Sequence, residues 1–442
     1  MSDLKQDLTR FDLTMIAIGG TIGSGIFLTP SLVAHGLGSP VLILFVWVVG
    51  GLMALAGSLT FAELGGLMPG AGGMYVYLSR TYGKLFGFLF GWAYLLVVNT
   101  GGIAALSIAF ATYLGYFVPL SALSIKFVAI GGLILLTALN VRGVRFGGIF
   151  SDVFTLLKLA GICGVILVGF LLGSKTTTDF AAPSTLAPGD LLTALGAAMV
   201  GVFWSYGGWQ HASFTAGEAK DAKHSVPFAM VAGAFCVTLL YVTINVAYMF
   251  LLPPAAIGDS SRVAADAVGV ALGTAGGSLI AVMIFLSTFG SAGIYTLTAP
   301  RIYYAMASDG VFFKRVSEVH PLYRTPANAI LLQSTWAIVL ILFWGTFENL
   351  ISYVVFTDWI FFGLTAASVF VLRRRHPGSH RPYRTWGYPL TPLFFVILSL
   401  WFVANTLIEK PGQAWAGIIL LALGVPVYYY WNRQNSHPSH DR

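Results

Sequence analysis

The sequence predicts an all-helical membrane protein with twelve transmembrane helices, and composition is the first observation that indicates it. Of the 442 residues only 9% are charged, 57% are hydrophobic, and the mean hydropathy is +0.81. A soluble globular protein carries about 25% charged residues, so this chain has too few to cover a surface that faces water. The composition therefore excludes a soluble enzyme, a disordered protein and a nucleic-acid-binding protein, although the formal net charge is +7.

Apolar runs of membrane-spanning length are the second observation. A transmembrane helix needs about 20 predominantly apolar residues, and twelve such runs lie between charged or proline-rich breaks. The runs are continuous rather than alternating, which favours helices over the strands of a β-barrel. We expect spans at residues 12–34, 40–66, 85–115, 124–141, 150–173, 191–216, 226–252, 274–307, 327–346, 349–372, 389–408 and 413–431.

The distribution of Lys and Arg is the third observation. With an even number of spans both termini lie on one side, and that side carries nineteen of the 24 Lys and Arg residues. Because positive residues are enriched in cytoplasmic loops, both termini are predicted to be cytoplasmic, in the inner (plasma) membrane. The run 373–375 is then a topology anchor rather than a lipid-binding patch. The other five are Lys126, Lys175, Arg262 and Lys410 on the far side, and Lys158 inside a span.

The N-terminus and the cysteines complete the topology. Residues 1–10 are polar and mixed in charge, without the basic segment and cleavage site of a removable signal peptide. Cys163 and Cys236 both lie inside apolar runs, so no disulfide framework is expected.

The first span carries an unusual cluster of glycines at its centre. Each glycine costs about 1 kcal/mol relative to alanine in a helix, so membrane spanning alone does not account for the cluster. Close helix packing is one explanation, since Gly19 and Gly23 form a GxxxG pair; local unwinding is the other. The glycines are Gly19, Gly20, Gly23 and Gly25.

The sixth span favours unwinding, because it too carries a glycine pair, Gly207 and Gly208, near its middle. Glycine-interrupted spans at corresponding positions of two halves indicate a transporter site near the bilayer midplane. Five spans per half is an odd number, so the halves have opposite topology. We therefore expect one transporter domain over residues 1–431, with inverted repeats at about 10–173 and 191–373, extra helices at about 389–431, and a cytoplasmic tail at 432–442.

The two interruptions have complementary charge. Where the first span unwinds at residues 21–25, free N–H groups carry the positive end of the following half-helix, which suits a carboxylate. Around residues 205–208 the first half of the sixth span exposes carbonyls, which suit an ammonium. A zwitterionic amino acid matches both ends.

At these residues the chain resembles the amino acid-polyamine-organocation (APC) transporter superfamily, and its L-type amino acid transporter (LAT) branch in particular. The resemblance covers about residues 8–431 and implies the LeuT-like, or APC, fold. It is carried by the segments Thr21–Phe27 (TIGSGIF) and Tyr206–Trp209 (YGGW), with further matches at Phe61–Gly65, Tyr75–Tyr77, Pro300–Ala307 and Leu372–Arg375, and at Arg381 with Pro382.

The resemblance implies roles for individual residues. Trp204 would be the outer gate, at a place where the animal branch has phenylalanine; the alternative is ordinary aromatic packing. The carboxylate end would be lined by Thr21, Ile22, Gly23, Ser24 and Gly25, and the amine end by Phe203, Ser205, Tyr206 and Gly207.

Lys158 lies about eight residues into the fifth span, so its charge must be paired or near water. It either snorkels to the cytoplasmic interface or, as the resemblance implies, occupies the place of sodium in sodium-coupled relatives. In the second case its ammonium would bond carbonyls of the first span and groups of the eighth, and transport would not need sodium. The candidates in the eighth span are Ser287, Thr288 and Ser291.

Asp358 is a second charge near mid-depth, in the tenth span. It could contact a polar substrate side chain, hold a proton, or pair within the bundle, and the sequence leaves these roles open. Three other ionisable residues are expected to be structural: Glu63 and Glu218 as capping or loop-pairing groups, and His211 as a hydrogen-bonded histidine rather than a proton shuttle.

These observations predict a secondary transporter and not an enzyme. The spans contain no hydrolase motif, phosphate loop, selectivity filter or metal cluster, and no cofactor is expected. We expect a bacterial-type member that exchanges small neutral L-amino acids independently of sodium, by alternating access. The alternatives are proton-coupled symport, transport of cationic amino acids or polyamines, and a membrane amino acid sensor. Animal relatives bind a heavy chain through a loop cysteine that residues 116–126 lack, so no covalent subunit is expected.

Overall fold

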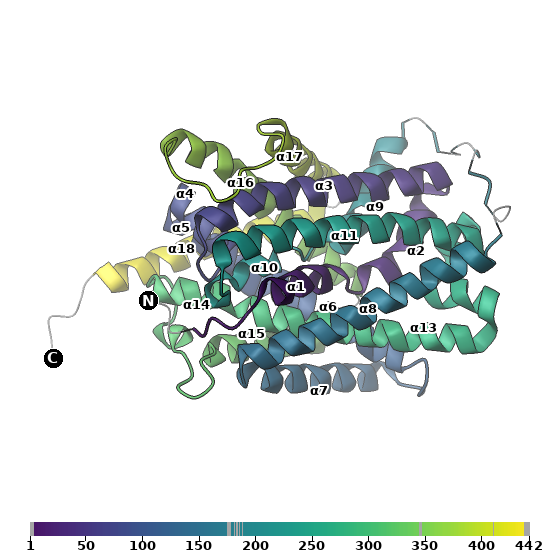
Figure 1. Cartoon of the computed structure of the whole chain (residues 1–442), viewed down its shortest axis with the longest axis horizontal. Helices are drawn as coiled ribbons and strands as arrows, with labels where there is room; N and C mark the ends of the chain where they lie inside the picture. Colours follow the sequence, from purple (N-terminus) through teal and green to yellow (C-terminus); the bar gives the residue numbers. More distant parts are fainter. Residues whose placement is uncertain are drawn as a thin grey trace.

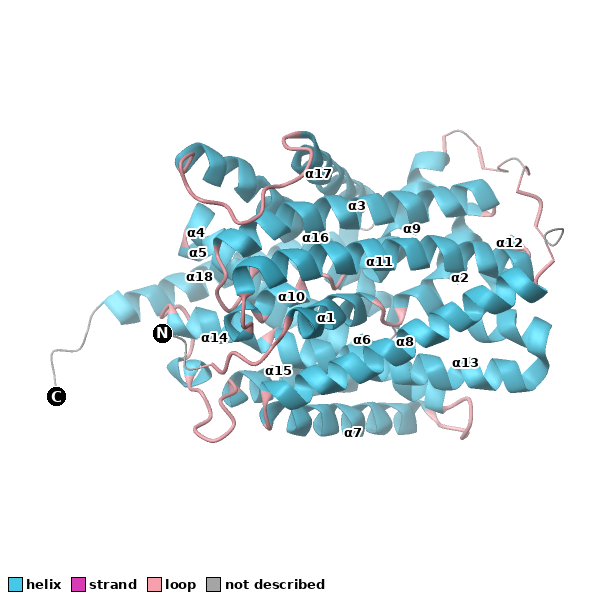
Figure 2. Cartoon of the chain, in the orientation of Figure 1, coloured by secondary structure: helices cyan, strands magenta, loops and turns pink. Residues whose placement is uncertain are grey.

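The computed structural model describes residues 4–174, 178–180, 182, 184, 186, 187, 189–343, 347–409 and 411–436. Within these ranges the protein is built from helices, with no β-strand (Figure 2). One isolated backbone bridge joins Leu8 to Ala219 and holds the N-terminal segment against the loop that follows the sixth span. Two positions of the charge analysis, Lys175 and Lys410, and the tail from residue 437 lie outside the described residues.

The first half of the chain forms the first five predicted spans. Its helices are α1 (Arg10–Thr21), α2 (Gly25–Leu37), α3 (Pro40–Leu67), α4 (Met74–Tyr82), α5 (Lys84–Ala93), the π-helix η1 (Tyr94–Val98), α6 (Asn99–Leu114), α7 (Ala122–Val141) and α8 (Val144–Leu172).

The second half begins with the other broken span and continues to the last two helices. Its elements are α9 (Leu191–Tyr206), α10 (His211–Phe214), the 3-10 helix η2 (Ala216–Glu218), α11 (Ala222–Leu251), α12 (Pro254–Asp259), α13 (Val263–Thr298), α14 (Pro300–Ser308), the 3-10 helix η3 (Lys314–Ser317), α15 (Ala327–Phe343), α16 (Phe347–Arg375), α17 (Leu390–Glu409) and α18 (Pro411–Ser436).

All twelve predicted spans correspond to helical segments. Ten described segments are long and apolar enough to cross a membrane, and the shorter apolar helices α9 and α15 account for the sixth and ninth spans. The predicted start of the eighth span at residue 274 coincides with a break in α13, because Gly273 has a φ of +68° and divides α13 into two helical parts.

The first span lies at the centre of the bundle. In the most apolar 18-residue stretch of this span, 83% of the residues are buried inside the protein. The corresponding share is 22% for α7, which lies at the lower edge in Figure 1. Large apolar side chains on the peripheral helices are exposed, including Leu171, Phe343 and Ile408. These are the positions that the hydrocarbon of a bilayer would cover.

Local sequence explains where several helices begin. Before α1, Thr9 and Asp12 form a reciprocal capping box, with the Thr9 N–H donating to Asp12 Oδ2 at 2.6 Å. Proline stands in the first turn of α3, α12 and α14, where its missing N–H costs nothing. The segment leading into α1 and the last turns of α18 lie at the same end of the bundle, at the left of Figure 1.

Candidate functional site

The first predicted interruption lies between α1 and α2. α1 ends at Thr21, and the ψ of 88° at Ile22 is outside the helical region. α2 begins at Gly25, and its N-cap residue Ser24 makes no side-chain capping hydrogen bond. Because the first N–H groups of a helix have no intrahelical acceptor, the start of α2 presents donors and the positive end of the helix dipole.

The second interruption lies between α9 and α10. α9 ends at Tyr206, Gly207 is extended, and Gly208 has a φ of +131°, which favours glycine. The Gly208 N–H donates to Oε1 of Gln210 at 2.8 Å, so the Gln210 side chain holds the turn. The last carbonyls of a helix lack intrahelical donors, and the end of α9 therefore presents acceptors.

The two interruptions touch through glycine backbones. A Cβ on Gly208 would overlap the backbone of Gly20, and a Cβ on Gly25 would lie 2.6 Å from the Cα of Ser205. The hydroxyls of Thr29 and Ser205 are hydrogen-bonded at 2.7 Å, which fixes α2 on α9. The donor end of one half-helix thus lies beside the acceptor end of another.

The predicted residues of the first interruption stay close to it. Ile22 is fully buried, and Gly23 faces α6 and α13, where a Cβ would lie 3.2 Å from Leu106. The Ser24 hydroxyl is buried and has no hydrogen-bond partner among the described residues. The Thr21 hydroxyl instead donates to the Ala17 carbonyl of its own helix at 2.8 Å, so Thr21 contributes backbone rather than side chain.

Two predicted rings of the sixth span pack against neighbouring helices, beside Gly207 of the interruption. The Phe203 ring stacks on Trp359 of α16 with a centroid distance of 3.9 Å. The Tyr206 hydroxyl donates to the Trp47 carbonyl of α3 at 2.9 Å, and its ring also packs on Tyr241 of α11. The sequence could not indicate this, because a helix that is apolar all round does not reveal which face meets which neighbour.

Trp204 is buried between α9 and α6. If Gly102 carried a Cβ, this atom would lie 3.9 Å from the Trp204 ring and 3.0 Å from the Tyr295 ring. Glycine at position 102 therefore leaves room for both aromatic rings beside the break.

Lys158 is buried and bonds to the first span and the eighth, as predicted. Its Nζ donates to the Gly19 carbonyl and contacts the Ser291 hydroxyl, both at 2.6 Å. The Ser291 hydroxyl also lies 2.9 Å from the carbonyls of Gly19 and Ile22. The side chain ends inside the bundle rather than at an interface, so the snorkelling alternative does not describe it.

The other two predicted residues of the eighth span do not contact Lys158. The Thr288 hydroxyl donates to carbonyls of its own helix, at 2.9 Å from Ile284 and 3.1 Å from Phe285. The Ser287 hydroxyl is buried without a hydrogen-bond partner among the described residues. Of the three predicted residues, only Ser291 hydrogen-bonds to the unwound segment, so the predicted set was too wide.

Asp358 borders the second interruption. The side chain is buried, and its Oδ1 has no hydrogen-bond partner among the described residues. Its carboxyl lies within electrostatic range of the hydroxyls of Tyr94 and Tyr295. Tyr94 in turn accepts a long hydrogen bond of 3.5 Å from Nε2 of Gln210, so a polar chain leads from the α9–α10 turn toward α16.

Tyr94 opens the wide turn η1, which interrupts the third span. Within it the Asn99 N–H donates to the Tyr94 carbonyl, five residues back, and the Thr100 hydroxyl takes up the Leu95 carbonyl at 2.7 Å. Such π-turns occur frequently at functional sites. Sequence analysis missed Tyr94, because an aromatic residue in an apolar run has no distinguishing signal; Gln210 could have been found as a polar residue beside the Gly207–Gly208 pair.

Comparison with known proteins assigns this arrangement to a family. The family model described as "Amino acid permease" matches residues 8–428. The chain belongs to the amino acid permeases of the APC superfamily. It is 32% identical over 431 residues to the serine/threonine exchanger SteT of Bacillus subtilis, covering 96% of this chain and 97% of that protein. The permease is therefore a transporter and not an enzyme.

Human relatives show similar coverage. The permease is 31% identical to the human Asc-type amino acid transporter 1 over 438 residues, which is 96% of this chain and 82% of that one. It is 29% identical to the human cystine/glutamate transporter over 435 residues, which is 96% and 85% of the two chains. The relatives carry different named substrates, so family membership does not fix the substrate of the permease.

Glu63 and Glu218, the expected capping or loop-pairing groups, both form ion pairs, with partners that sequence analysis did not identify. Nε of Arg301 in α14 donates to Oε2 of Glu218 at 2.7 Å, and both side chains are fully buried. Glu63 of α3 pairs with Arg373 at 2.6 Å and with Arg381 at 3.0 Å. Arg373 is thus more than a topology anchor. Partners 83 or more residues apart have no local signal in the sequence.

His211 has a structural environment, as predicted. Its Nδ1 is hydrogen-bonded to the Thr298 hydroxyl of α13, and its ring packs on Tyr295 at a centroid distance of 4.2 Å. These contacts fix the half-helix after the second interruption against α13.

Proposed function

We propose that this permease exchanges small neutral L-amino acids across the plasma membrane, independently of sodium and by alternating access. One observation carries the proposal: the N-terminal end of α2 at Gly25 lies beside the C-terminal end of α9 at Ser205. A carboxylate and an ammonium on one carbon fit these two ends. The name of the serine/threonine exchanger, at 32% identity, supports small neutral substrates and the exchange mode.

The Lys158 contacts support sodium independence. The ammonium is bonded to the carbonyl of Gly19 and the hydroxyl of Ser291. Without the lysine, these two oxygen atoms would suit a sodium ion. A fixed positive charge at this place ties α1 to α8 and α13. A second cation would meet electrostatic repulsion there.

The transport cycle would use the two inverted repeats, about 10–173 and 191–373, as moving parts. Substrate would bind at the two interruptions, between spans one and six, and be covered by Trp204 on the outer side. One bundle would then rock against the other and open the site to the cytoplasm, where we place both termini. We propose no covalent heavy chain, because Cys163 and Cys236 both lie within helices, α8 and α11.

The experiment is uptake of labelled amino acids into proteoliposomes that are preloaded with each amino acid in turn, with and without a pH gradient. Exchange predicts that uptake requires a preloaded substrate, that serine, threonine and alanine are among the best, and that replacing sodium with choline changes nothing. Uptake into empty vesicles driven by a pH gradient would contradict the exchange mode. Saturable binding with no uptake under any condition would indicate a sensor instead.

Proton-coupled or cationic transport is the second candidate, because Asp358 has a buried carboxylate oxygen without a partner among the described residues. Such a group could hold a proton or pair with a cationic side chain. Lysine, arginine and agmatine belong in the same preloading series for this reason. Preference for these cations would favour the second candidate.

A further inference from the structure

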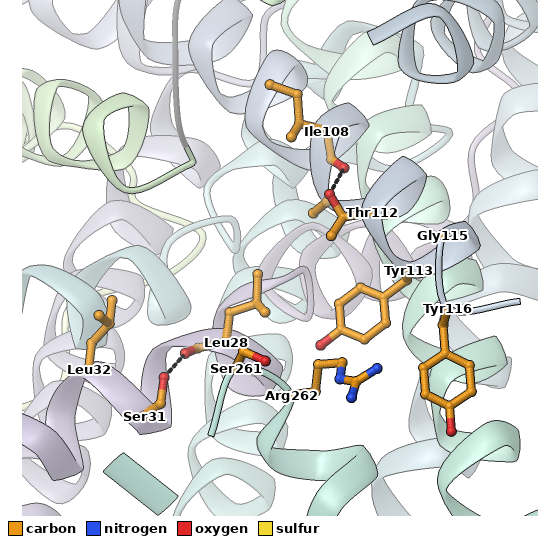
Figure 3. Close-up of a pocket in the computed structure, with 11 residues that line it drawn as sticks. Leu28, Ser31, Leu32, Ile108, Thr112, Tyr113, Gly115, Tyr116, Ser261 and Arg262 are labelled. Atoms are coloured by element: carbon orange, nitrogen blue, oxygen red, sulfur yellow. Dashed lines mark hydrogen bonds between the residues drawn. The ribbon is translucent and has the colours of Figure 1, made fainter. Parts of the chain in front are cut away.

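A pocket of about 460 Å³ lies between α2, α6 and the segment leading into α13, at the end of the bundle away from the termini. Figure 3 shows its lining residues. Its wall on the α2 side is formed by Leu28, Ser31 and Leu32. These residues follow Gly25 by three to seven positions, which is about 5–10 Å along the helix. The pocket therefore lies one to two turns outward from the donor end of α2.

Arg262 is the only charged residue among the described residues that line this pocket. Its guanidinium lies over the Tyr116 ring, 5.0 Å from the centroid, and makes no ion pair with a carboxylate of the described chain. Asp266, one turn into α13, is not part of the lining, and its Oδ2 accepts from the Ser260 hydroxyl at 2.6 Å. The N–H groups of the Arg262 guanidinium are therefore available to bind a ligand in the pocket.

Tyr113 supplies a second, independent group. Its side chain is 3% exposed and lines the pocket, and its hydroxyl has no hydrogen-bond partner among the described residues. In Figure 3 this hydroxyl points toward the Arg262 side chain. A buried hydroxyl without a partner is costly, so a ligand oxygen placed between Tyr113 and Arg262 would satisfy both groups.

Two other hydroxyls of the pocket are already used as donors. The Ser31 hydroxyl donates to the Leu28 carbonyl and the Thr112 hydroxyl to the Ile108 carbonyl, both at 2.9 Å. The guanidinium of Arg262 and the phenol of Tyr113 are donors that a ligand could use beside the apolar walls. Arginine binds a carboxylate with two parallel hydrogen bonds, which selects a carboxylate attached to a small apolar group.

We propose that this pocket is an outer binding site for the carboxylate of a zwitterionic amino acid, occupied before the ligand reaches the break between α1 and α2. The inference rests on the proposed function, since it assumes that amino acids are the substrates and that the termini are cytoplasmic. Capture by Arg262 and Tyr113 would raise the local substrate concentration at the outer mouth. The same carboxylate chemistry could come from a free fatty acid, which the experiment separates.

The test compares exchange from the two sides of the membrane. The outer KM for serine is measured in intact cells that produce the full-length protein, and the inner KM in inside-out vesicles. For R262Q we expect the outer KM to rise about tenfold, from loss of a charge-assisted pair, with the inner KM and kcat within about twofold. Y113F should raise the outer KM by a smaller factor, about threefold. K126Q removes another charge of the predicted outer side, at a partly buried lysine outside the pocket, and should leave both constants unchanged.

The outcomes distinguish an amino acid from a fatty acid as the ligand of the pocket. They also distinguish failure of the outer site from failure of the proposed function. An unchanged outer KM in R262Q, or an equal rise on both sides, would overturn the outer site while leaving exchange intact. Oleate added to wild-type and R262Q vesicles tests the lipid source: inhibition lost in R262Q with an unchanged serine KM would show that the pocket holds a fatty acid and would also overturn the proposal. Absence of exchange by the wild-type protein would instead refute the proposed function.

Discussion

The Nζ of Lys158 lies 2.6 Å from the carbonyl of Gly19 and so joins the middle of α8 to the last turn of α1. α1 is the half-helix that leads into the first interruption. Any motion that separates α1 from α8 must therefore break or rearrange this bond. The contact couples the state of the bundle to the geometry of the site.

Lys158→Ala should nearly abolish exchange while the protein still folds. The change removes the charged donor shared by the Gly19 carbonyl and the Ser291 hydroxyl. Loss of a buried hydrogen-bond partner costs about 1–3 kcal/mol, which corresponds to about fivefold to a hundredfold in rate. Exchange in proteoliposomes is the measurement, with monodispersity on size exclusion as the test of folding. Ser291→Ala should have a smaller effect, because Lys158 would keep its bond to Gly19.

Wild-type exchange should be equal in sodium and choline buffers. Strict dependence on sodium would contradict the role given to Lys158. Near-normal exchange in Lys158→Ala would show that the bond to Gly19 is not needed for the cycle. Lys126→Ala is the matched control, because it removes a partly buried lysine that is bonded to a carbonyl outside the site, that of Leu342 at 2.8 Å.

Gly25→Val should remove substrate binding. A Cβ at this position would lie 2.6 Å from the Cα of Ser205, so the start of α2 would have to move away from α9. Equilibrium binding of labelled serine to purified protein measures the loss. Gly36→Ala is the matched control on the same helix, because nothing lies within 4 Å of a Cβ there.

Decarboxylated amines should not compete for uptake if the N–H groups at the start of α2 hold the carboxylate. Ethanolamine, which is serine without its carboxylate, is the probe, and serine itself is the positive control. Competition by ethanolamine at concentrations close to those of serine would show that the carboxylate is not recognised, and the assignment of the α2 end would have to be abandoned.

Trp204→Ala should reduce turnover strongly while binding is retained. A gate shapes the occluded state rather than the span, so kcat should fall by about tenfold or more while the protein purifies normally. Trp204→Phe should retain much of the activity, because it keeps an aromatic ring beside Gly102. Unchanged kinetics in Trp204→Ala would leave Trp204 as a packing residue.

Asp358→Asn separates the two proposed transport modes. Under exchange, the variant should change the order of substrate preference and leave counterflow almost independent of pH. Under proton coupling, it should abolish accumulation driven by a pH gradient and spare exchange. Both assays use the same proteoliposomes, and the second pattern would contradict an exchange-only mechanism.

Sequence alone predicted the parts of the site that depend on backbone and charge. Glycine clusters at residues 19–25 and 207–208 mark the interruptions because they weaken a helix, and Lys158 is conspicuous because a charge inside an apolar span needs a partner. The sequence could not predict which neighbouring helix each side chain contacts. Tyr206 meets Trp47, and Arg301 meets Glu218, through packing between segments distant in the chain.

The wide turn η1 has a consequence for angular register along the third span. Each residue of a regular α-helix adds a rotation of about 100°, so eight residues would turn Gly102 about 80° away from Tyr94. A π-turn absorbs one extra residue, and the difference falls to about 20°. Tyr94 can then approach Gln210 while Gly102 lies against Trp204, on one face of the helix. Deleting a single residue between Tyr94 and Val98 would leave the two positions seven residues apart on a regular helix, so they would stay on one face without the wide turn.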